Sequence, residues 1–276
     1  MLDIGISSCG FEPIEDYFKA LKEAGIKNIE LSRAWTEYDS LDYDEIKHLS
    51  QKYGVNIWSF HLPFADPQHV DIASLDEEIR QKSVEWWCRL IKTGAEMGVK
   101  IFVAHPSSEP ISEDPEIRSK NIAAAKKSLK ELAEFAAEYD AVIAVEDLPR
   151  TCLGRNSDEI AELLSADSRL RVCFDTNHLL IEDNLKFIEK LGNKIVTLHV
   201  SDYDFTDEKH WLPGEGKIDW QALYTALIAK GYNGVWMYEL YLKTPQTIER
   251  PRDLEFNDFI ENATQIFENK PLQIKF

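Results

Sequence analysis

The amino-acid sequence predicts a (β/α)8 TIM barrel, and three observations support this fold class. Eight short β-rich segments alternate with eight helical segments along the chain. The β-rich segments are near-continuous apolar runs, which is typical of parallel strands covered by helices. No linker, low-complexity tract or change in composition divides the 276 residues. We therefore expect one α/β domain covering residues 1–276, because eight such units exceed the about six strands of many open doubly wound sheets.

The predicted elements follow one another without a break. Residues rich in β-branched and aromatic side chains predict strands at 4–8, 27–32, 55–61, 99–105, 141–147, 170–176, 195–201 and 234–240. Helical periodicity predicts helices at 13–24, 42–53, 75–97, 115–139, 157–166, 183–191, 219–230 and 252–268. Ser74 and Glu77 have the spacing of a capping box at the start of the third helix. Asp219 is expected to be the N-cap of the seventh helix.

Composition limits the classes of partner. With 44% hydrophobic and 29% charged residues, no stretch reaches the about 20 apolar residues of a membrane span, and the start MLDIGISSCG lacks a basic signal-peptide region. We therefore expect a cytoplasmic protein without a membrane partner. The four cysteines show no C-x-x-C spacing, which favours buried reduced thiols. The formal net charge of -18 argues against a nucleic-acid partner bound through its phosphates.

Six consecutive predicted strands, the third to the eighth, end in a residue that can bind a metal ion. These residues are His61, His105, Glu146, Asp175, His199 and Glu239. The C-terminal ends of the strands form the active face of such a barrel. Any one of these side chains alone would more often be a surface group or a satisfied core residue. Together they would meet in one mouth, where the carboxylates repel one another unless a cation is present. The pattern therefore predicts a metal site.

The chemistry of the ligands narrows the choice of ion. Glu146, Asp175, His199 and Glu239 form an oxygen-rich set. Such a set suits Mn²⁺, Mg²⁺ or Co²⁺ better than a structural zinc, although Zn²⁺ stays open, and we expect Mn²⁺ first. With His61, His105 and His178 also expected close by, nitrogen ligands are numerous enough for a second or third ion.

Five motifs together resemble the xylose isomerase-like barrel superfamily: VEDLP, FDTNH, LHVSD, HWLPGEGKIDW and MYEL. The resemblance covers essentially the whole chain and is strongest to the sugar isomerases and epimerases related to tagatose and psicose epimerases, inosose dehydratase and hydroxypyruvate isomerase. It implies that Glu146, Asp175, His199 and Glu239 hold the metal. It also implies that Glu146 and Glu239 move protons and that His178 contacts a substrate oxygen.

These features predict a divalent-metal-dependent sugar isomerase or epimerase that acts on a ketose or a related polyol ketone. Removal of a proton next to a carbonyl gives an enediolate, which a metal acting as a Lewis acid stabilises. Glu146 and Glu239 are the expected acid/base pair. The residues expected to bind the sugar substrate are His61, His105, His178, His210 and Trp211.

Two other enzyme classes stay open. This chain has His210 where ketose epimerases of this kind usually carry an Arg, and Glu208 lies two residues earlier. Together with His61 and His105, these residues resemble the trinuclear ligand set of zinc-dependent apurinic endonucleases. The net charge and the compact loops favour sugar chemistry over a nuclease. A dehydratase of the inosose dehydratase type shares the enediolate and stays an alternative. A non-catalytic sugar-binding barrel would be expected to lack metal ligands.

Several further residues have both a structural and a functional interpretation. Trp35, Trp58 and Phe64 follow predicted strand ends and could wall a sugar pocket or pack in the core, as could Trp211. Arg150 and Arg155 could bind an anionic substrate, although two arginines in a loop are usually solvated. The EWW segment indicates helix packing or an oligomer contact, so a homo-oligomer stays open.

Overall fold

The computed structural model describes residues 1–9, 11–243 and 247–273. Within these ranges, eight strands alternate with eight α-helices. The strands are β1 (Ile4–Ser7), β2 (Asn28–Leu31), β3 (Asn56–His61), β4 (Ile101–Ala104), β5 (Val142–Glu146), β6 (Arg171–Asp175), β7 (Ile195–His199) and β8 (Trp236–Tyr238). The helices are α1 (Glu15–Ala24), α2 (Tyr43–Tyr53), α3 (Glu77–Glu96), α4 (Pro115–Ala137), α5 (Ser157–Leu164), α6 (Asn184–Leu191), α7 (Trp220–Ala229) and α8 (Phe256–Phe267). Short 3-10 turns η1 (Tyr38–Ser40) and η2 (Gly192–Lys194) precede α2 and β7.

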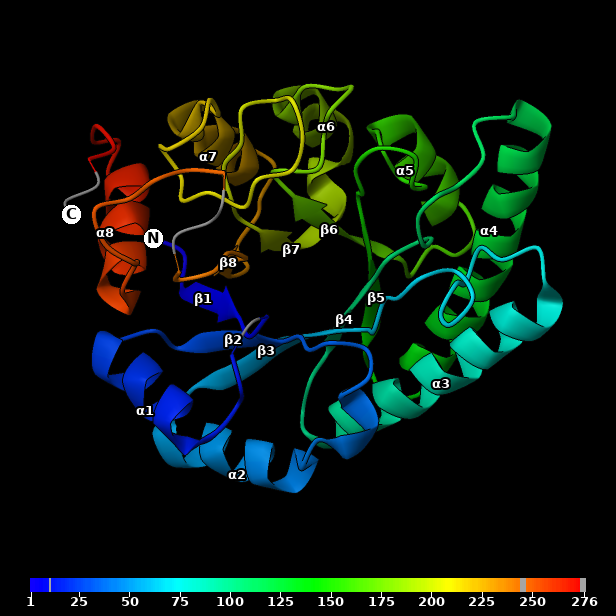
Figure 1. Ribbon diagram of the computed structural model, residues 1–276, viewed down its shortest axis with the longest axis horizontal. Helices are drawn as coiled ribbons and strands as arrows, with labels where there is room; N and C mark the ends of the chain where they lie inside the picture. Colours follow the sequence, from blue (N-terminus) through cyan, green and yellow to red (C-terminus); the bar gives the residue numbers. More distant parts are fainter. Residues whose placement is uncertain (10, 244–246, 274–276) are drawn as a thin grey trace.

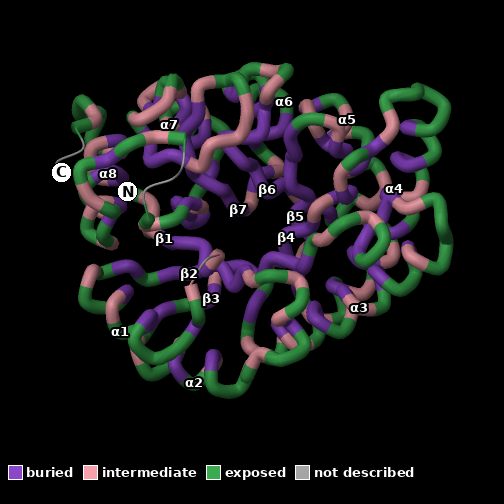
Figure 2. The backbone as a smooth tube through the Cα atoms, viewed as in Figure 1, coloured by how far each residue is buried: buried purple, intermediate pink, exposed green. Residues whose placement is uncertain are grey.

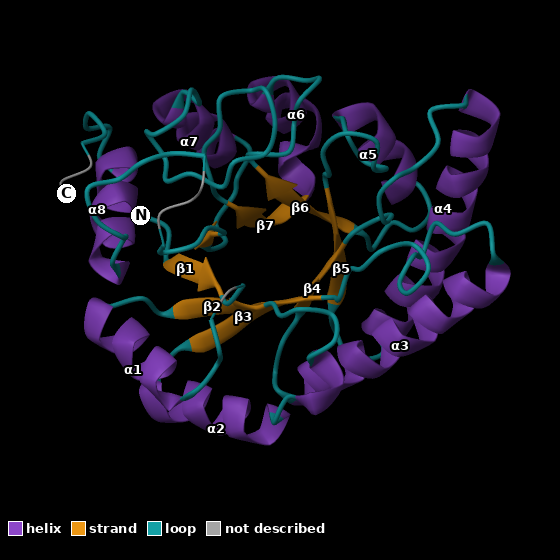
Figure 3. Ribbon diagram, viewed as in Figure 1, coloured by secondary structure: helices purple, strands orange, loops and turns teal. Residues whose placement is uncertain are grey.

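The strands form a central ring, and the helices surround it (Figures 1 and 3). Their order is β7-β6-β5-β4-β3-β2-β1-β8, and the pairs within it are parallel. The ring closes between β7 and β8, because Val200 N donates a hydrogen bond to the Met237 carbonyl at 2.8 Å and Glu239 N donates to the Val200 carbonyl at 3.2 Å. The predicted (β/α)8 barrel is therefore confirmed.

The main hydrophobic core lies between the ring of strands and the helices, where buried residues follow the strands and the inner faces of the helices (Figure 2). Phe60, Trp87 and Phe102 are examples of its fully buried side chains. Burial of each such side chain stabilises the fold by roughly 1.5–3 kcal/mol. Helix α3 packs closely on β4, because a Cβ atom added to Gly94 would lie 2.6 Å from the ring of Phe102.

The strands are shorter than the sequence predicts. β4 ends at Ala104 and β8 ends at Tyr238, so His105 and Glu239 each lie one residue beyond a strand. The parallel ladder stops where the chain turns into a βα loop, and both predicted strands extend one or two residues into that loop. The side chains of both residues nevertheless lie at the C-terminal face of the barrel.

Helix caps test the predicted starts of two helices. The capping box of Ser74 and Glu77 is wrong, because α3 begins at Glu77 and its N-cap is Asp76, whose carboxylate accepts from Glu78 N at 2.9 Å. Ser74 instead accepts from Asp76 N at 3.2 Å and forms a local turn before the helix. The predicted cap of α7 is confirmed, since Asp219 accepts from Ala222 N at 3.0 Å.

Two expectations from composition concern the whole chain. None of the helices in the described ranges has the length and apolar character needed to cross a bilayer. The four cysteines are free thiols; Cys152 and Cys173 are buried, while Cys9 and Cys88 are partly exposed. The prediction of unpaired cysteines is confirmed, and the prediction of burial holds for two of them.

Candidate functional site

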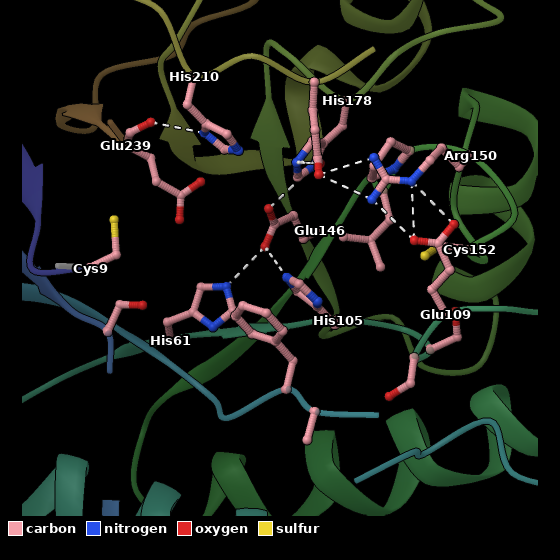
Figure 4. A pocket seen from close by; sticks show the side chains of 18 of the residues that line it. Cys9, His61, His105, Glu109, Glu146, Arg150, Cys152, His178, His210 and Glu239 are labelled. Carbon is pink, nitrogen blue, oxygen red and sulfur yellow. Dashed lines mark hydrogen bonds and ion pairs between the residues drawn. The ribbon is translucent and has the colours of Figure 1, made fainter. Parts of the chain in front are cut away.

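A pocket of about 360 Å³ opens at the C-terminal face of the barrel. This volume lies at the small end of the range for small-molecule sites, roughly 300–1,000 Å³. Its lining comes from strand ends and from the loops that follow the eight strands, and it includes Cys9, Ser32, His61, Phe64, His105, Glu109, Glu146, Arg150, His178, Glu208, His210, Glu239 and Tyr241. Figure 4 shows Glu146 between His61, His105 and His178, with Glu239 and His210 on one side and Arg150 and Glu109 on the other.

Glu146, the last residue of β5, contacts two histidines at the ends of β3 and β7 and a third directly after β4. Its Oε2 lies 3.2 Å from His61 Nε2 and 3.2 Å from His105 Nε2, and its Oε1 lies 3.0 Å from His199 Nδ1. Burial alone would raise the pKa of Glu146, but the neighbouring His199 and His105 hold the pKa well below its usual range. The carboxylate is therefore ionised and has histidines on both of its oxygens.

The four residues predicted to hold the metal form one cluster, which we call the main cluster: Glu146, Asp175, His199 and Glu239. Their candidate ligand atoms all lie within 4.8 Å of one another. His199 Nδ1 is 3.8 Å from Asp175 Oδ2 and 3.4 Å from Glu239 Oε2. Burial raises the pKa of Asp175 and of Glu239. Asp175 Oδ2 is buried and accepts no hydrogen bond from the described residues. A buried carboxylate oxygen without a donor beside other carboxylates fits a bound cation.

Three histidines at the pocket share one arrangement of their rings. Nδ1 of each lies within hydrogen-bonding distance of a backbone carbonyl: His61 with Leu62 at 2.8 Å, His178 with Asp147 at 2.9 Å and His210 with Glu239 at 3.1 Å. A carbonyl can only accept, so Nδ1 carries the proton and donates it. In the neutral ring, Nε2 therefore keeps its lone pair. Such fixing of one ring nitrogen is typical of histidines that ligate metals.

Of the further groups that could hold an ion, two consist of residues outside the main cluster apart from Glu146. The first is His61, His105 and Glu146, which shares Glu146 with the main cluster. The second is His178, Glu208 and His210, in which Glu208 Oε2 lies 3.3 Å from His178 Nε2. Burial raises the pKa of Glu208, but His178 outweighs this effect and lowers the pKa to about 2. The structure thus gathers every residue that the sequence suggested for a second or third ion.

The loop between β7 and α7 is folded around the buried carboxylate of Asp202. This carboxylate accepts from Gly214 N at 2.8 Å, from Ile218 N at 3.2 Å and from the indole of Trp220 at 2.8 Å. A Cβ atom at Gly216 would lie 2.2 Å from Asp202 Oδ1, so only glycine fits there. The PGEGKIDW motif therefore contains the N-cap of α7 and also packs against Asp202, the residue that anchors the loop.

Arg150 joins three loops at the mouth of the pocket. Its guanidinium lies 3.1 Å from Glu109 after β4, and 3.0 Å from both Asp207 and Glu208 after β7. The backbone at Arg150 is in the left-handed region, with φ of 52°. Its donors are engaged by carboxylates of the protein, and one nitrogen of Arg155 pairs with Glu113 at 2.7 Å. The alternative of an anion-binding pair of arginines is therefore not favoured.

The four aromatic residues considered for the pocket wall are placed differently. Phe64 lines the pocket and stacks on His105 with ring centroids 4.4 Å apart. Trp211 is buried, donates its indole N–H to Thr247 Oγ1 at 2.9 Å and is not among the residues that line the pocket. Trp58 donates to Thr197 Oγ1 at 3.3 Å, and Trp35 lies against His69 with centroids 4.8 Å apart. Phe64 is the one of the four that could contact a ligand in this pocket.

One acidic residue below the pocket is not among those that the strand-end pattern predicts. Glu30 in β2 is fully buried, and its carboxylate contacts His199 on the ring nitrogen opposite the main cluster. Its signal in the sequence is a single carboxylate inside the apolar run NIEL. The strand-end pattern does not include Glu30, because this residue does not lie at the end of its strand.

Comparisons with known proteins agree with this architecture. A family model described as "Xylose isomerase-like TIM barrel" matches residues 18–256. Fructoselysine 3-epimerase of Shigella flexneri is 25% identical over 273 residues, which cover 91% of this chain and 97% of the relative. The crystal structure of a D-tagatose 3-epimerase-like protein superposes with a TM-score of 0.81 at 25% identity and covers 97% of this chain and 98% of that one.

A nuclease is also among the relatives. The protein named Probable endonuclease 4 of Thermoplasma acidophilum is 26% identical over 187 residues, which cover 61% of this chain and 62% of the relative. The matched family model spans most of the chain, and the barrel with its cluster of carboxylates and histidines agrees with the resemblance that the motifs indicated. The chain therefore belongs to the xylose isomerase-like TIM barrel family.

Proposed function

We propose that this protein is a divalent-metal-dependent sugar isomerase or epimerase that acts on a ketose or a related polyol ketone. The main cluster at the C-terminal face of the barrel carries the proposal, because it joins three carboxylates and one imidazole, and two of its carboxylates, Glu146 and Glu239, line a pocket sized for a small molecule. The names of the fructoselysine and tagatose epimerase relatives support the same class of chemistry.

Glu146 and Glu239 are the proposed acid/base pair. They come from β5 and from the residue after β8, so they approach the main cluster from different parts of the ring. One carboxylate takes the proton next to the carbonyl and the other returns a proton to the same or the neighbouring carbon. An ion held by the main cluster, Mn²⁺ first and Mg²⁺, Co²⁺ or Zn²⁺ as alternatives, would supply the Lewis acid for the charge that develops on the substrate oxygens.

The pocket histidines are the proposed substrate contacts. His61, His105, His178 and His210 line the pocket. Nδ1 of His61, His178 and His210 is engaged by the backbone, so Nε2 is the nitrogen available to a ligand. We do not extend the proposal to Trp211, because its indole is engaged with Thr247 away from the pocket.

Proton exchange with solvent tests the proposal. When the Mn²⁺-loaded protein is incubated in D₂O with a panel of ketoses, we expect a substrate to gain carbon-bound deuterium next to its carbonyl, measured by NMR and mass spectrometry. The same protein stripped of metal is the control and should give no incorporation. A product lighter by one water would indicate the dehydratase alternative. The absence of exchange with every ketose would contradict the proposal.

A phosphodiesterase of the apurinic endonuclease kind is the second candidate. The two additional ligand groups around His61 and His178 favour it, because they complete a set for three ions. The net charge of -18 opposes it, since a DNA-binding surface needs clustered cations. Incision of abasic duplex DNA at low salt, together with the absence of deuterium exchange into ketoses, would establish this candidate instead.

The charge of the pocket mouth predicts that the substrate is not phosphorylated. Asp66, Glu109 and Glu208 line the pocket, and Arg150, the one arginine among the described lining residues, is already paired with carboxylates. A phosphorylated ketose should therefore compete with the preferred substrate at least about tenfold more weakly than its unphosphorylated parent, a difference of about 1.4 kcal/mol. Inhibition constants for such a pair measure this. Glu109→Gln should reduce the discrimination, and tighter binding of the phosphate ester would contradict the prediction.

A further inference from the structure

We infer that Glu30, a residue outside the main cluster, positions His199 for metal binding by holding its ring in one tautomer and one orientation. The inference rests on the proposed metal centre and assigns a function to a residue from β2, a strand that contributes nothing to the cluster itself. The main support is that His199 lies between the carboxylates of Glu146 and Glu30, with one ring nitrogen facing each of them.

The geometry separates the two nitrogens of His199. Nε2 lies 3.0 Å from Glu30 Oε1 and 3.1 Å from Glu30 Oε2, whereas Nδ1 lies 3.0 Å from Glu146 Oε1. Both Glu30 and His199 have 0% exposure, so no solvent competes for either nitrogen. An ionised carboxylate can only accept hydrogen bonds, so Nε2 carries a proton toward Glu30. Nδ1 faces Glu146 of the main cluster, and it would bind an ion through its lone pair while the proton on Nε2 stays with Glu30.

Glu30 is itself held from the strands on both sides of β2. Ser59 Oγ of β3 donates to Glu30 Oε2 at 2.8 Å, and Ser7 Oγ of β1 donates to Glu30 Oε1 at 3.3 Å. Both serines are fully buried. Four strands therefore fix the pair, since β1, β2 and β3 orient the carboxylate and β7 carries the imidazole across the interior of the barrel. A ring fixed in this way loses little freedom when it binds an ion.

Packing alone does not account for a glutamate at this position. Burial of another carboxylate beneath Glu146, Asp175 and Glu239 costs free energy, and an apolar side chain would fill the same space without that cost. A carboxylate that accepts from the distal N–H of a metal-binding histidine is a recurrent arrangement, and its loss weakens metal binding by about 10- to 100-fold. The placement of Glu30 matches this arrangement on the one histidine of the main cluster.

Metal affinity tests the inference directly. Wild type and Glu30→Gln are stripped of metal and titrated with Mn²⁺ by calorimetry, after circular dichroism and thermal melting have verified the fold. We expect the Kd of Glu30→Gln to rise by about 10- to 100-fold. Glu23→Gln is the matched control, because it removes one charge at an exposed site of α1. Its Kd should stay within about twofold of wild type, as expected for a screened surface charge.

Two further variants keep the test valid if Glu30→Gln does not fold. Glu30→Asp preserves the charge but withdraws the carboxylate, so it should also weaken Mn²⁺ binding if orientation matters. Ser59→Ala removes one of the donors that hold Glu30 and should raise the Kd severalfold. In the Zn²⁺-loaded wild type, ¹⁵N NMR should show the His199 proton on Nε2. A proton on Nδ1 in that state would overturn the inference.

The outcomes distinguish this inference from the proposed function. If wild type binds no divalent ion, the metal centre fails, and the role of Glu30 fails with it. If wild type binds Mn²⁺ and Glu30→Gln binds it equally well, the role of Glu30 alone is overturned and the metal centre stands. If Glu30→Gln weakens binding while Glu30→Asp does not, charge rather than orientation is responsible, which also overturns positioning.

Discussion

Replacing Glu146 with Gln is expected to lower kcat/KM for the ketose substrate by at least about a thousandfold. The change removes a proposed proton carrier, a step that typically contributes about 10²- to 10⁴-fold, and weakens the metal centre at the same time. Glu146 is the residue shared by the main cluster and the group of His61 and His105. Steady-state kinetics combined with metal analysis of the purified variant measures both effects.

Two comparisons make this result specific. Glu239→Gln should show a loss of similar size, because Glu239 is the partner in proton transfer and also belongs to the main cluster. Glu113→Gln, at an exposed site outside the pocket, should keep near-normal kinetics. Thermal melting separates a lost function from a lost fold. Near-normal turnover by folded Glu146→Gln would rule out the mechanism with two carboxylates.

Removal of the metal is expected to reduce activity to background and to lower the melting temperature. Without a cation, Asp175 and Glu239 lie buried close to the ionised Glu146, and burial raises the pKa of both. An ion that binds the folded state at 100 times its Kd adds about 2.7 kcal/mol to the free energy of unfolding. Chelation, followed by titration of Mn²⁺ with activity and melting temperature as readouts, measures both effects.

The number of metal ions per chain needed to restore activity distinguishes the two candidate functions. For the sugar enzyme, one Mn²⁺ per chain should restore full activity. The same titration of Glu146→Gln should produce little rise in melting temperature. Full activity in the continued absence of divalent ions would contradict the proposed metal dependence. A need for about three zinc ions would favour the phosphodiesterase, since several metals clamp the attacking and leaving oxygens in such reactions.

The barrel and most of the site could be predicted because their signals are local. Each strand is an apolar run, and each βα unit repeats the same alternation. His61, Glu146, Asp175 and His199 are the last residues of their strands, a position that can be recognised from the sequence once the strands are assigned. Closure of the ring then brings these residues together without further information from the sequence.

Other features depend on contacts between distant segments. Glu30 meets His199 across the barrel interior, 169 positions along the chain, and nothing near either residue indicates the contact. Asp202 belongs to the motif LHVSD, but its role in folding the next loop depends on donors that lie up to 18 residues away. Trp211 follows His210 directly but does not line the pocket, and its indole N–H donates a hydrogen bond to Thr247. Such orientations follow from the folded loops and not from residue type.

The ion pairs of Arg150 at the mouth of the pocket also constrain how a substrate can enter. One guanidinium ties the loops that follow β4, β5 and β7, so these loops cannot swing apart separately without breaking charged hydrogen bonds. On the rest of the rim, Phe64 after β3 and Tyr241 after β8 are exposed by 49% and 54%. Ion pairs therefore hold together the loops after β4, β5 and β7. Accessible aromatic rings line the part of the mouth formed by the loops after β3 and β8. A sugar is therefore expected to pass over these rings, whose faces suit its apolar C–H surfaces.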